Sequence, residues 1–294
     1  MERDEGLRAA CFLALDALRA RLGDELPYAG GLDAGFVYDG HRIPFLLTAK
    51  GIYRSARQRG RAALSVQTSS KNPYGDTETD AGFEYAYRAG SVDQADNVAL
   101  REAHLLQVPL VYFVGMRPGI YRPEYPWFVE QDDQFARRVL LSPGTMRQGE
   151  PERPADDIER RYLTREARVR LHQRRFRGLV LTAYRDRCAV CRLHEPRLLD
   201  ASHIVADRDP AGVAAVRNGL AFCSIHHRAF DQELVGVSPD YQVRVSPRLL
   251  DDEDGPMLDL LKGFHGRTIE LPRPLASRPD RELLAERFAR FSAA

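Results

Sequence analysis

The chain has 294 residues, enough for two domains of ordinary size, and its formal net charge of +1 by itself says nothing about a nucleic-acid partner. No apolar run reaches the roughly 18 residues of a transmembrane helix, and the charged start MERDEGLRAA lacks the apolar core of a signal peptide. Four cysteines are too few for a disulfide scaffold, so we expect a cytoplasmic protein.

The first half of the chain predicts one helix followed by a mostly β domain. Apolar residues recur near helical spacing over residues 1–22, which predicts an amphipathic helix. They are Leu7, Phe12, Leu15, Leu18 and Leu22. Between about 27 and 140, turn signals separate short strand-like runs: FVYDG, IPFLLTA, AALSVQT, FEYAYRA and VPLVYFVGM. DNVALREAHLL, between the last two runs, predicts a helix.

A polar stretch then precedes an arginine-rich segment. Residues 142–157 hold three prolines and two glycines, which is typical of a linker. From Ile158 to Val190 ten arginines and three acids give 10 − 3 = +7 in a sequence that favours a helix. Such a block suits contact with phosphates, and a solvated helix surface is the alternative. We therefore predict domains at 1–145 and 161–294, with a linker at 146–160 and a short helix near the C-terminus.

Two closely spaced pairs of metal-binding side chains lie in the second domain. Cys188 and Cys191 form the first pair, and Cys223 and His226 form the second. Structural zinc prefers four such ligands in a tetrahedron, and two intervening residues let a turn aim both side chains of a pair at one ion. The spacing predicts a structural Zn²⁺ site, with buried cysteines and bystander histidines as the alternative. Cys11 lies in an apolar helical pattern and is predicted to be core.

His227 is predicted to serve a second site. On a helix it projects about 100° away from His226, whereas Asp231, four residues on, shares its face. An imidazole nitrogen and a carboxylate oxygen together suit Mg²⁺, Mn²⁺ or a similar divalent cation. A hydrogen bond between the two side chains on the helix surface is the alternative.

Two residues between the pairs complete a candidate catalytic group. His203 follows LLDAS, a segment compatible with a strand, and its neutral imidazole could take a proton from water. Asn218 precedes a glycine in a predicted turn, from which its amide could fix the loop that orients His203. A cation at His227 would stabilise charge on a scissile phosphate and its leaving oxygen.

The run from about Phe176 to Val245 resembles the HNH endonucleases. The matching pieces are FRGLVLTAYRDRCAVC, LLDASHI, NGLAFCSIHHRAFDQELVGV and YQVRVS. The resemblance implies a ββα-metal fold in which His203 is the general base, Asn218 the family's asparagine and His227 a metal ligand. It also implies the zinc-stapled variant of that fold, with His226 in place of the usual final cysteine.

One position departs from the pattern of that family. Many members carry Asp or His directly before the catalytic histidine as a further metal ligand, and this chain has Ser202 there. Asp231 stands where some relatives have a second ligand on the helix. The missing ligand could therefore be Asp231, Asp200, Ser202 or water.

Two pieces of the N-terminal domain, DQADNVAL and GIYRPEYPW, resemble runs in the SRA-type domains. The resemblance implies a β-rich SRA/PUA-like domain that binds DNA with a modified cytosine flipped out of the duplex. With the ββα-metal domain, the whole chain is then α+β.

A flipped base needs aromatic faces on both sides and polar groups at its Watson–Crick edge. The candidate aromatic residues are Tyr28, Phe36, Tyr38, Tyr53, Tyr85 and Trp127. The candidate acceptors for a cytosine amino group are Asp39 and Asp93. The residues that could hold phosphates or fill the vacated stack are Arg54, Arg57 and Arg59. For each aromatic residue, the core of a β-sheet is the alternative.

Together these features predict a modification-dependent DNA endonuclease that recognises 5-methylcytosine or 5-hydroxymethylcytosine and cuts by metal-assisted hydrolysis. One such site cuts one strand, so a double-strand break would require a homodimer on double-stranded DNA. Two other functions stay open: an HNH restriction endonuclease or nickase for unmodified DNA, and a non-catalytic zinc-stapled DNA-binding protein.

Overall fold

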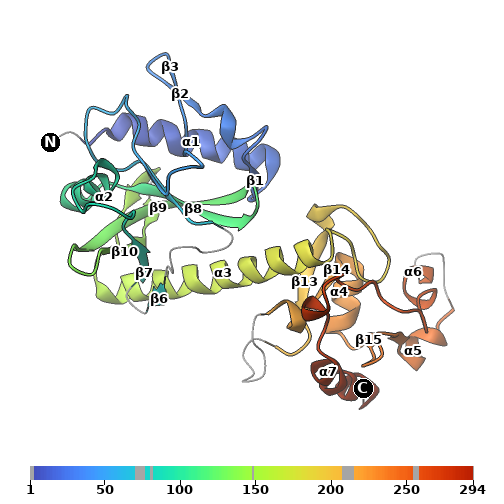
Figure 1. Ribbon diagram of the computed structural model, residues 1–294. Helices are drawn as coiled ribbons and strands as arrows, with labels where there is room; N and C mark the ends of the chain where they lie inside the picture. The colour runs from blue at the N-terminus through green and yellow to red at the C-terminus, as the bar shows by residue number, and fades with distance from the viewer. Residues whose placement is uncertain are drawn as a thin grey trace. The chain divides into compact units, whose positions relative to one another are not determined.

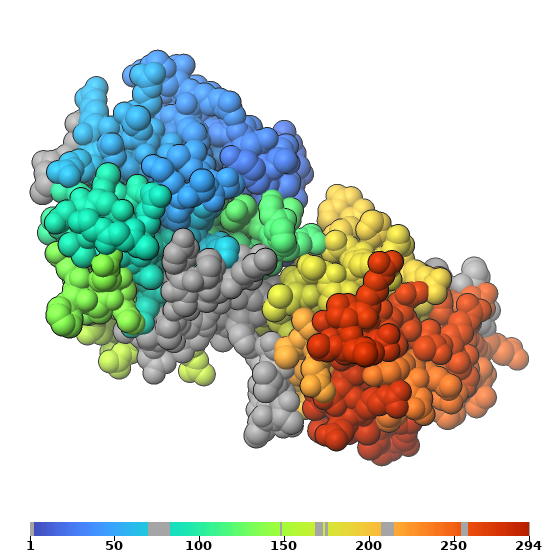
Figure 2. Space-filling model, viewed as in Figure 1, coloured from blue at the N-terminus to red at the C-terminus, as the bar shows by residue number. Residues whose placement is uncertain are grey.

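The computed structural model describes residues 3–69, 77–79, 82–147, 149–206, 215–253 and 258–293. The chain forms two compact units, Met1–Leu171 and His172–Ala294. The division falls inside one long helix, α3 (Asp157–Ala183). Figure 1 labels many of the helices and strands, and Figure 2 shows one face of the molecule as a space-filling view in the same colours.

The N-terminal helix was predicted from its apolar spacing and is confirmed. Helix α1 (Glu5–Leu22) buries one face, which carries Leu7, Cys11, Phe12, Leu15 and Leu18. Leu22, the last apolar position of the pattern, is instead 36% exposed because the helix ends there. The second predicted helix is α2 (Ala95–Leu106), which contributes Ala99, Leu100 and Ala103 to the core.

The first unit is built around an eight-stranded sheet. Seven of its strands follow the order β4-β5-β8-β9-β10-β7-β6, and the eighth, β1, pairs with β9. Only the pairing of β5 with β8 is parallel; the other pairings are antiparallel. The strands are β1 (Leu26–Pro27), β4 (Ile52–Tyr53), β5 (Ser65–Gln67), β6 (Thr77–Thr79), β7 (Gly82–Ala86), β8 (Leu110–Arg117), β9 (Ile120–Asp133) and β10 (Arg138–Pro143). Outside this sheet, β2 (Phe36–Tyr38) and β3 (His41–Ile43) form a hairpin.

Four of the five predicted strand-like runs contain a strand, and the fifth does not. In IPFLLTA only Ile43 belongs to a strand, at the end of β3. Pro44 follows and lacks the N–H that a continuing ladder would need. Phe45 and Leu46 are nevertheless buried, so this irregular segment was correctly apolar but is not a strand.

The predicted linker at 146–160 contains regular structure. Strand β11 (Thr145–Arg147) pairs with β12 (Glu150–Glu152), and α3 begins at Asp157. Gly149 has φ +84° in the turn between the strands, where glycine is favoured. The strand residues are exposed or half-buried. No alternation of apolar and polar residues therefore marked this hairpin in the sequence.

The second unit contains a ββα arrangement. Strand β13 (Leu199–His203) pairs antiparallel with β14 (Gly219–Cys223), and α4 (Ser224–Asp231) follows directly. A Cβ at Gly219 would lie 2.4 Å from Val180 and 2.9 Å from Phe176, both on α3. The backbone of Gly219 is extended, so its conformation does not itself require glycine. The close packing of α3 does, because it leaves no room for a side chain.

Shorter elements complete the second unit and enclose its core. They are the 3₁₀ turns η2 (Pro196–Leu198), η3 (Val216–Asn218) and η4 (Leu275–Ser277), the strands β15 (Val235–Val237) and β16 (Val243–Val245), and the helices α5 (Pro247–Leu250), α6 (Asp259–Lys262) and α7 (Arg281–Ala293). The α+β class and the C-terminal helix were predicted and are confirmed. Among the described residues no helix is both long and apolar enough to cross a membrane.

The core of the first unit generates a stability prediction. Trp127 is 2% exposed and contacts Phe83 and Tyr112 edge-on, at 5.0 Å between ring centroids in each case. We expect Trp127→Ala to lower the free energy of unfolding of this unit by about 3–5 kcal/mol, because the cavity cannot collapse fully. Denaturant unfolding measures the change. Phe135→Ala is the control, since Phe135 is fully exposed, and an equally large loss there would contradict this assignment.

Candidate active site and zinc centre

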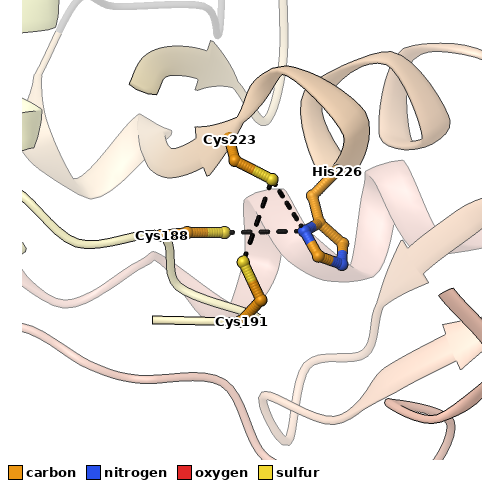
Figure 3. A group of neighbouring side chains, drawn as sticks. All are labelled: Cys188, Cys191, Cys223 and His226. Carbon is orange, nitrogen blue, oxygen red and sulfur yellow. Dashed lines mark hydrogen bonds between the residues drawn. The ribbon is translucent and has the colours of Figure 1, made fainter. Parts of the chain in front are cut away.

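The two pairs of metal-binding side chains come together as the sequence predicted. The ligand atoms of Cys188, Cys191, Cys223 and His226 all lie within 4.8 Å of one another (Figure 3). The cysteines are free thiols, and the sulfurs of Cys191 and Cys223 are 3.9 Å apart. A tetrahedral ion with Zn–S bonds of about 2.3 Å would separate two sulfurs by about 3.8 Å. The donor set and its spacing therefore fit Zn²⁺.

His226 presents Nδ1 to the sulfurs. This nitrogen lies 3.0 Å from the sulfur of Cys223 and 3.6 Å from that of Cys188. Nε2 lies 3.0 Å from the carbonyl oxygen of Leu260, which can only accept a hydrogen bond. Nε2 therefore carries the proton, which leaves the Nδ1 lone pair for a metal ion.

The ligand atoms of the cluster shift one another's pKa values in opposite directions. Burial by itself lowers the pKa of His226, but hydrogen bonds with Cys191 and Cys223 outweigh it and raise the pKa to about 9. Hydrogen bonds from Cys188 and Cys191 hold the pKa of Cys223 well below its usual range, and the same group of bonds raises the pKa of Cys188. Zinc binds thiolates and a neutral imidazole, so binding of the ion displaces protons from the cluster.

His203, Asn218 and His227 lie on three elements of the ββα region: the end of β13, η3 and α4. Asn218 is buried, and its carboxamide makes two bonds to one residue just beyond His203. The amide N–H of Val205 donates to Oδ1 at 2.9 Å, and Nδ2 donates to the Val205 carbonyl at 2.9 Å. The loop after His203 is thus held as the sequence predicted.

The imidazole of His203 is half-buried and stacked on a ring from α3. Its centroid lies 3.8 Å from that of Phe176, with 12° between the planes. The sequence did not indicate that Phe176 contacts His203, because Phe176 was only the first residue of the run that resembles the HNH family. The stacking fixes the plane of the imidazole.

Both nitrogens of His227 face carboxylates. Nε2 lies 3.5 Å from Oδ2 of Asp231, and Nδ1 lies 3.9 Å from Oδ2 of Asp200. Asp200 also lies 3.5 Å from the guanidinium Nε of Arg177, another residue whose role the sequence did not indicate. Ser202 is 2% exposed, and its Oγ lies 3.5 Å from the backbone oxygen of His203. Of the candidates for the missing ligand, the two aspartates therefore lie beside His227.

The residues predicted to read the base do not all gather in one place. Four of them, Tyr38, Asp39, Arg57 and Arg59, line one hollow of about 660 Å³ together with His41 and the start of α1. The carboxylate of Asp4 accepts hydrogen bonds from the backbone N–H groups of Arg59 and Gly60, which fixes that loop against α1.

The other seven lie away from that hollow. Four of the aromatic residues, Phe36, Tyr53, Tyr85 and Trp127, are buried in the core, and Tyr28 packs half-buried against it. Asp93 is exposed and pairs with Arg101 at 3.3 Å. Arg54 donates to the carbonyl of Gly60 at 3.3 Å.

Residues 188–238 match the family model described as HNH endonuclease. One solved structure, a modification-dependent TagI restriction endonuclease, matches with 15% sequence identity and a TM-score of 0.32, over 82% of this chain and 84% of that one. No curated protein matches the chain. Residues 188–238 of the second unit therefore belong to an HNH endonuclease domain, which supports a metal-dependent nuclease. The predicted ββα-metal fold and its zinc donor set are confirmed.

Removal of zinc is expected to destabilise the second unit. Structural zinc supplies about 10 kcal/mol or more of binding free energy to folding in small domains, so the Tm should fall by roughly 10 °C or more. Calorimetry before and after chelation, with metal analysis, measures the loss. Cys191→Ser should lose the metal, whereas Cys11→Ala should keep one zinc per chain because Cys11 lies outside the cluster. Zinc-free protein with an unchanged Tm would contradict the assignment.

Proposed function

We propose that the chain is a modification-dependent DNA endonuclease in which the second unit cuts the phosphodiester bond and the first unit recognises a modified cytosine. The observation that carries the nuclease site is the antiparallel pair β13 and β14 followed directly by α4, a ββα arrangement within the matched HNH segment on which His203, Asn218 and His227 lie. Asn218, 15 residues after His203, hydrogen-bonds to the backbone of Val205 and so holds the loop that follows the candidate base.

His203 acts as the general base that takes a proton from the attacking water. The stacked ring of Phe176 fixes the plane of the imidazole, and the bonds from Asn218 to Val205 fix the loop that follows. A positioned imidazole of this kind contributes about 10²- to 10⁴-fold to the rate of proton transfer.

His227 and Asp231 hold a divalent cation, Mg²⁺, Mn²⁺ or a similar ion. When bound, the cation supplies electrostatic stabilisation of the scissile phosphate and its leaving oxygen. A histidine ligates one ion through one nitrogen, so the two carboxylates beside His227 cannot have the same role. Nε2 and Asp231, which are closer, face the cation. Asp200 lies 3.9 Å from the opposite ring nitrogen, too far for a direct hydrogen bond, and its negative charge favours the orientation that turns that nitrogen toward it.

The first unit recognises 5-methylcytosine or 5-hydroxymethylcytosine by base flipping. The SRA-like pieces of its sequence support this, as does the hollow that brings Asp39 together with Arg57 and Arg59. Its volume lies in the range of ligand pockets. Asp39 accepts from the cytosine amino group and the two arginines contact the flanking phosphates. Two copies on double-stranded DNA are needed for a double-strand break.

The catalytic role of His203 can be tested by substitution. We expect His203→Ala to lower the single-turnover cleavage rate by about 10²- to 10⁴-fold, because water loses its general base. DNA affinity should be unchanged, since the substitution removes no contact to the phosphates that binding depends on. Cleavage at the parental rate would remove His203 from this role. If the parent cuts no DNA with any divalent metal, the chain is a binding protein instead.

Modified-base recognition is tested with three versions of one DNA fragment, plain, methylated and hydroxymethylated at cytosine. We expect cleavage of one or both modified fragments and little of the plain one. Asp39→Ala should reduce this discrimination, while Asp93→Ala should not, because Asp93 lies outside the hollow and pairs with Arg101. Equal cleavage of all three fragments would favour a nuclease for unmodified DNA.

A further inference from the structure

Helix α7 contacts the two elements that carry Asn218 and His227, η3 and α4. Helix α7 lies beyond residues 188–238, the segment that matches the HNH family model. It packs against β15, where a Cβ at Gly236 would lie 2.7 Å from the ring of Phe291. Two further contacts, one at its start and one in its middle, reach the elements that carry Asn218 and His227.

The first contact is made by Asp280, which precedes α7. Its backbone N–H donates to the carbonyl of Arg217 at 2.9 Å, and its carboxylate accepts a hydrogen bond from the Arg217 guanidinium. The same carboxylate accepts from the N–H of Glu282 at 2.9 Å and so caps the helix. Arg217 directly precedes Asn218 in η3. The start of α7 is therefore bonded to the turn from which Asn218 holds the loop after His203.

The second contact is made by Arg287, which is largely buried. One guanidinium nitrogen donates to the carbonyl of Phe230 at 2.8 Å and lies 3.0 Å from Glu233. The guanidinium carbon lies 4.6 Å from the centre of the Phe230 ring. Phe230 is in the last turn of α4, next to Asp231. A cation at this end of a helix satisfies its free carbonyls and opposes the negative pole of its dipole.

The two contacts connect η3 and α4 to one helix. Asn218 is on η3 and His227 is on α4, and along the chain β14 joins the two elements. Because Asp280 and Arg287 belong to one rigid helix segment, they tie both elements to the same support. A displacement of η3 or α4 by about 1 Å can reduce the rate of cleavage by about 100-fold.

We propose that Asp280 and Arg287 are positioning residues of the nuclease site, through which α7 sets the geometry of His203 relative to His227. This inference rests on the proposed nuclease function for its effect on rate. Its structural content, that Asp280 immobilises the Asn218 loop, is independent of that function and can be measured without DNA.

The first experiment uses Asp280→Asn and Arg217→Gln in the full-length, zinc-loaded protein. Asparagine caps a helix as well as aspartate does, so Asp280→Asn keeps α7 but removes the charge that holds Arg217. Hydrogen exchange at the Val205 amide, which donates to Asn218, should accelerate about tenfold in both variants. Arg290→Gln is the control, because Arg290 is on the same helix and, within the described part of the chain, forms its ion pair with the exposed Glu286. Unchanged exchange at Val205 would overturn the proposal.

The second experiment measures cleavage. We expect single-turnover rates to fall about tenfold in Asp280→Asn and Arg217→Gln, with KM and zinc content unchanged. The double variant should be no slower than either single variant, because both remove one interaction. Arg287→Met should slow cleavage similarly, and Arg287→Lys should restore part of the rate by keeping a charge at the end of α4. Parental rates in Asp280→Asn, Arg217→Gln and Arg287→Met would overturn the proposal, whereas a parent that cuts no DNA would instead contradict the proposed function.

Discussion

The second unit depends on the convergence of four metal-binding side chains from two distant parts of the chain. Cys188 and Cys191 lie in a turn after α3, while Cys223 ends β14 and His226 lies in the first turn of α4. Through the hydrogen bond from its other nitrogen to Leu260, His226 extends the centre to α6, outside the matched HNH segment. A small unit with few regular elements gains its rigidity from such a centre, because its apolar core alone is limited.

The zinc centre and the catalytic group share α4 but use different faces of it. His226 points to the sulfurs, and its neighbour His227 faces the carboxylates of Asp231 and Asp200. A metal ion in the Cys188–His226 cluster would therefore lie apart from the proposed chemistry and would fix the start of the helix that carries the second site. The same division explains why two adjacent histidines have different partners: successive residues on a helix project about 100° apart.

The candidate base, His203, is positioned by packing and hydrogen bonds from residues that take no part in the proposed proton transfer. Phe176 on α3 stacks on His203, and Asn218 holds the next stretch of backbone. Gly219 allows α3 to approach closely enough for that stacking, since any side chain there would overlap Phe176 and Val180. The precision of the site is therefore a property of α3, β14 and α7 together.

The sequence by itself determined what depends on spacing along one element. It predicted the zinc pairs, the shared helical face of His227 and Asp231, and helices α1, α2 and α7, because turns and helices bring near neighbours together. It missed β9, the longest strand, because prolines at 123 and 126 obscured the pattern. Only the tertiary structure could place Asp200 rather than Ser202 beside His227, put Trp127 in the core, and join Asp280 to Arg217. Each of these is a contact between distant segments, and such contacts depend on how the elements pack.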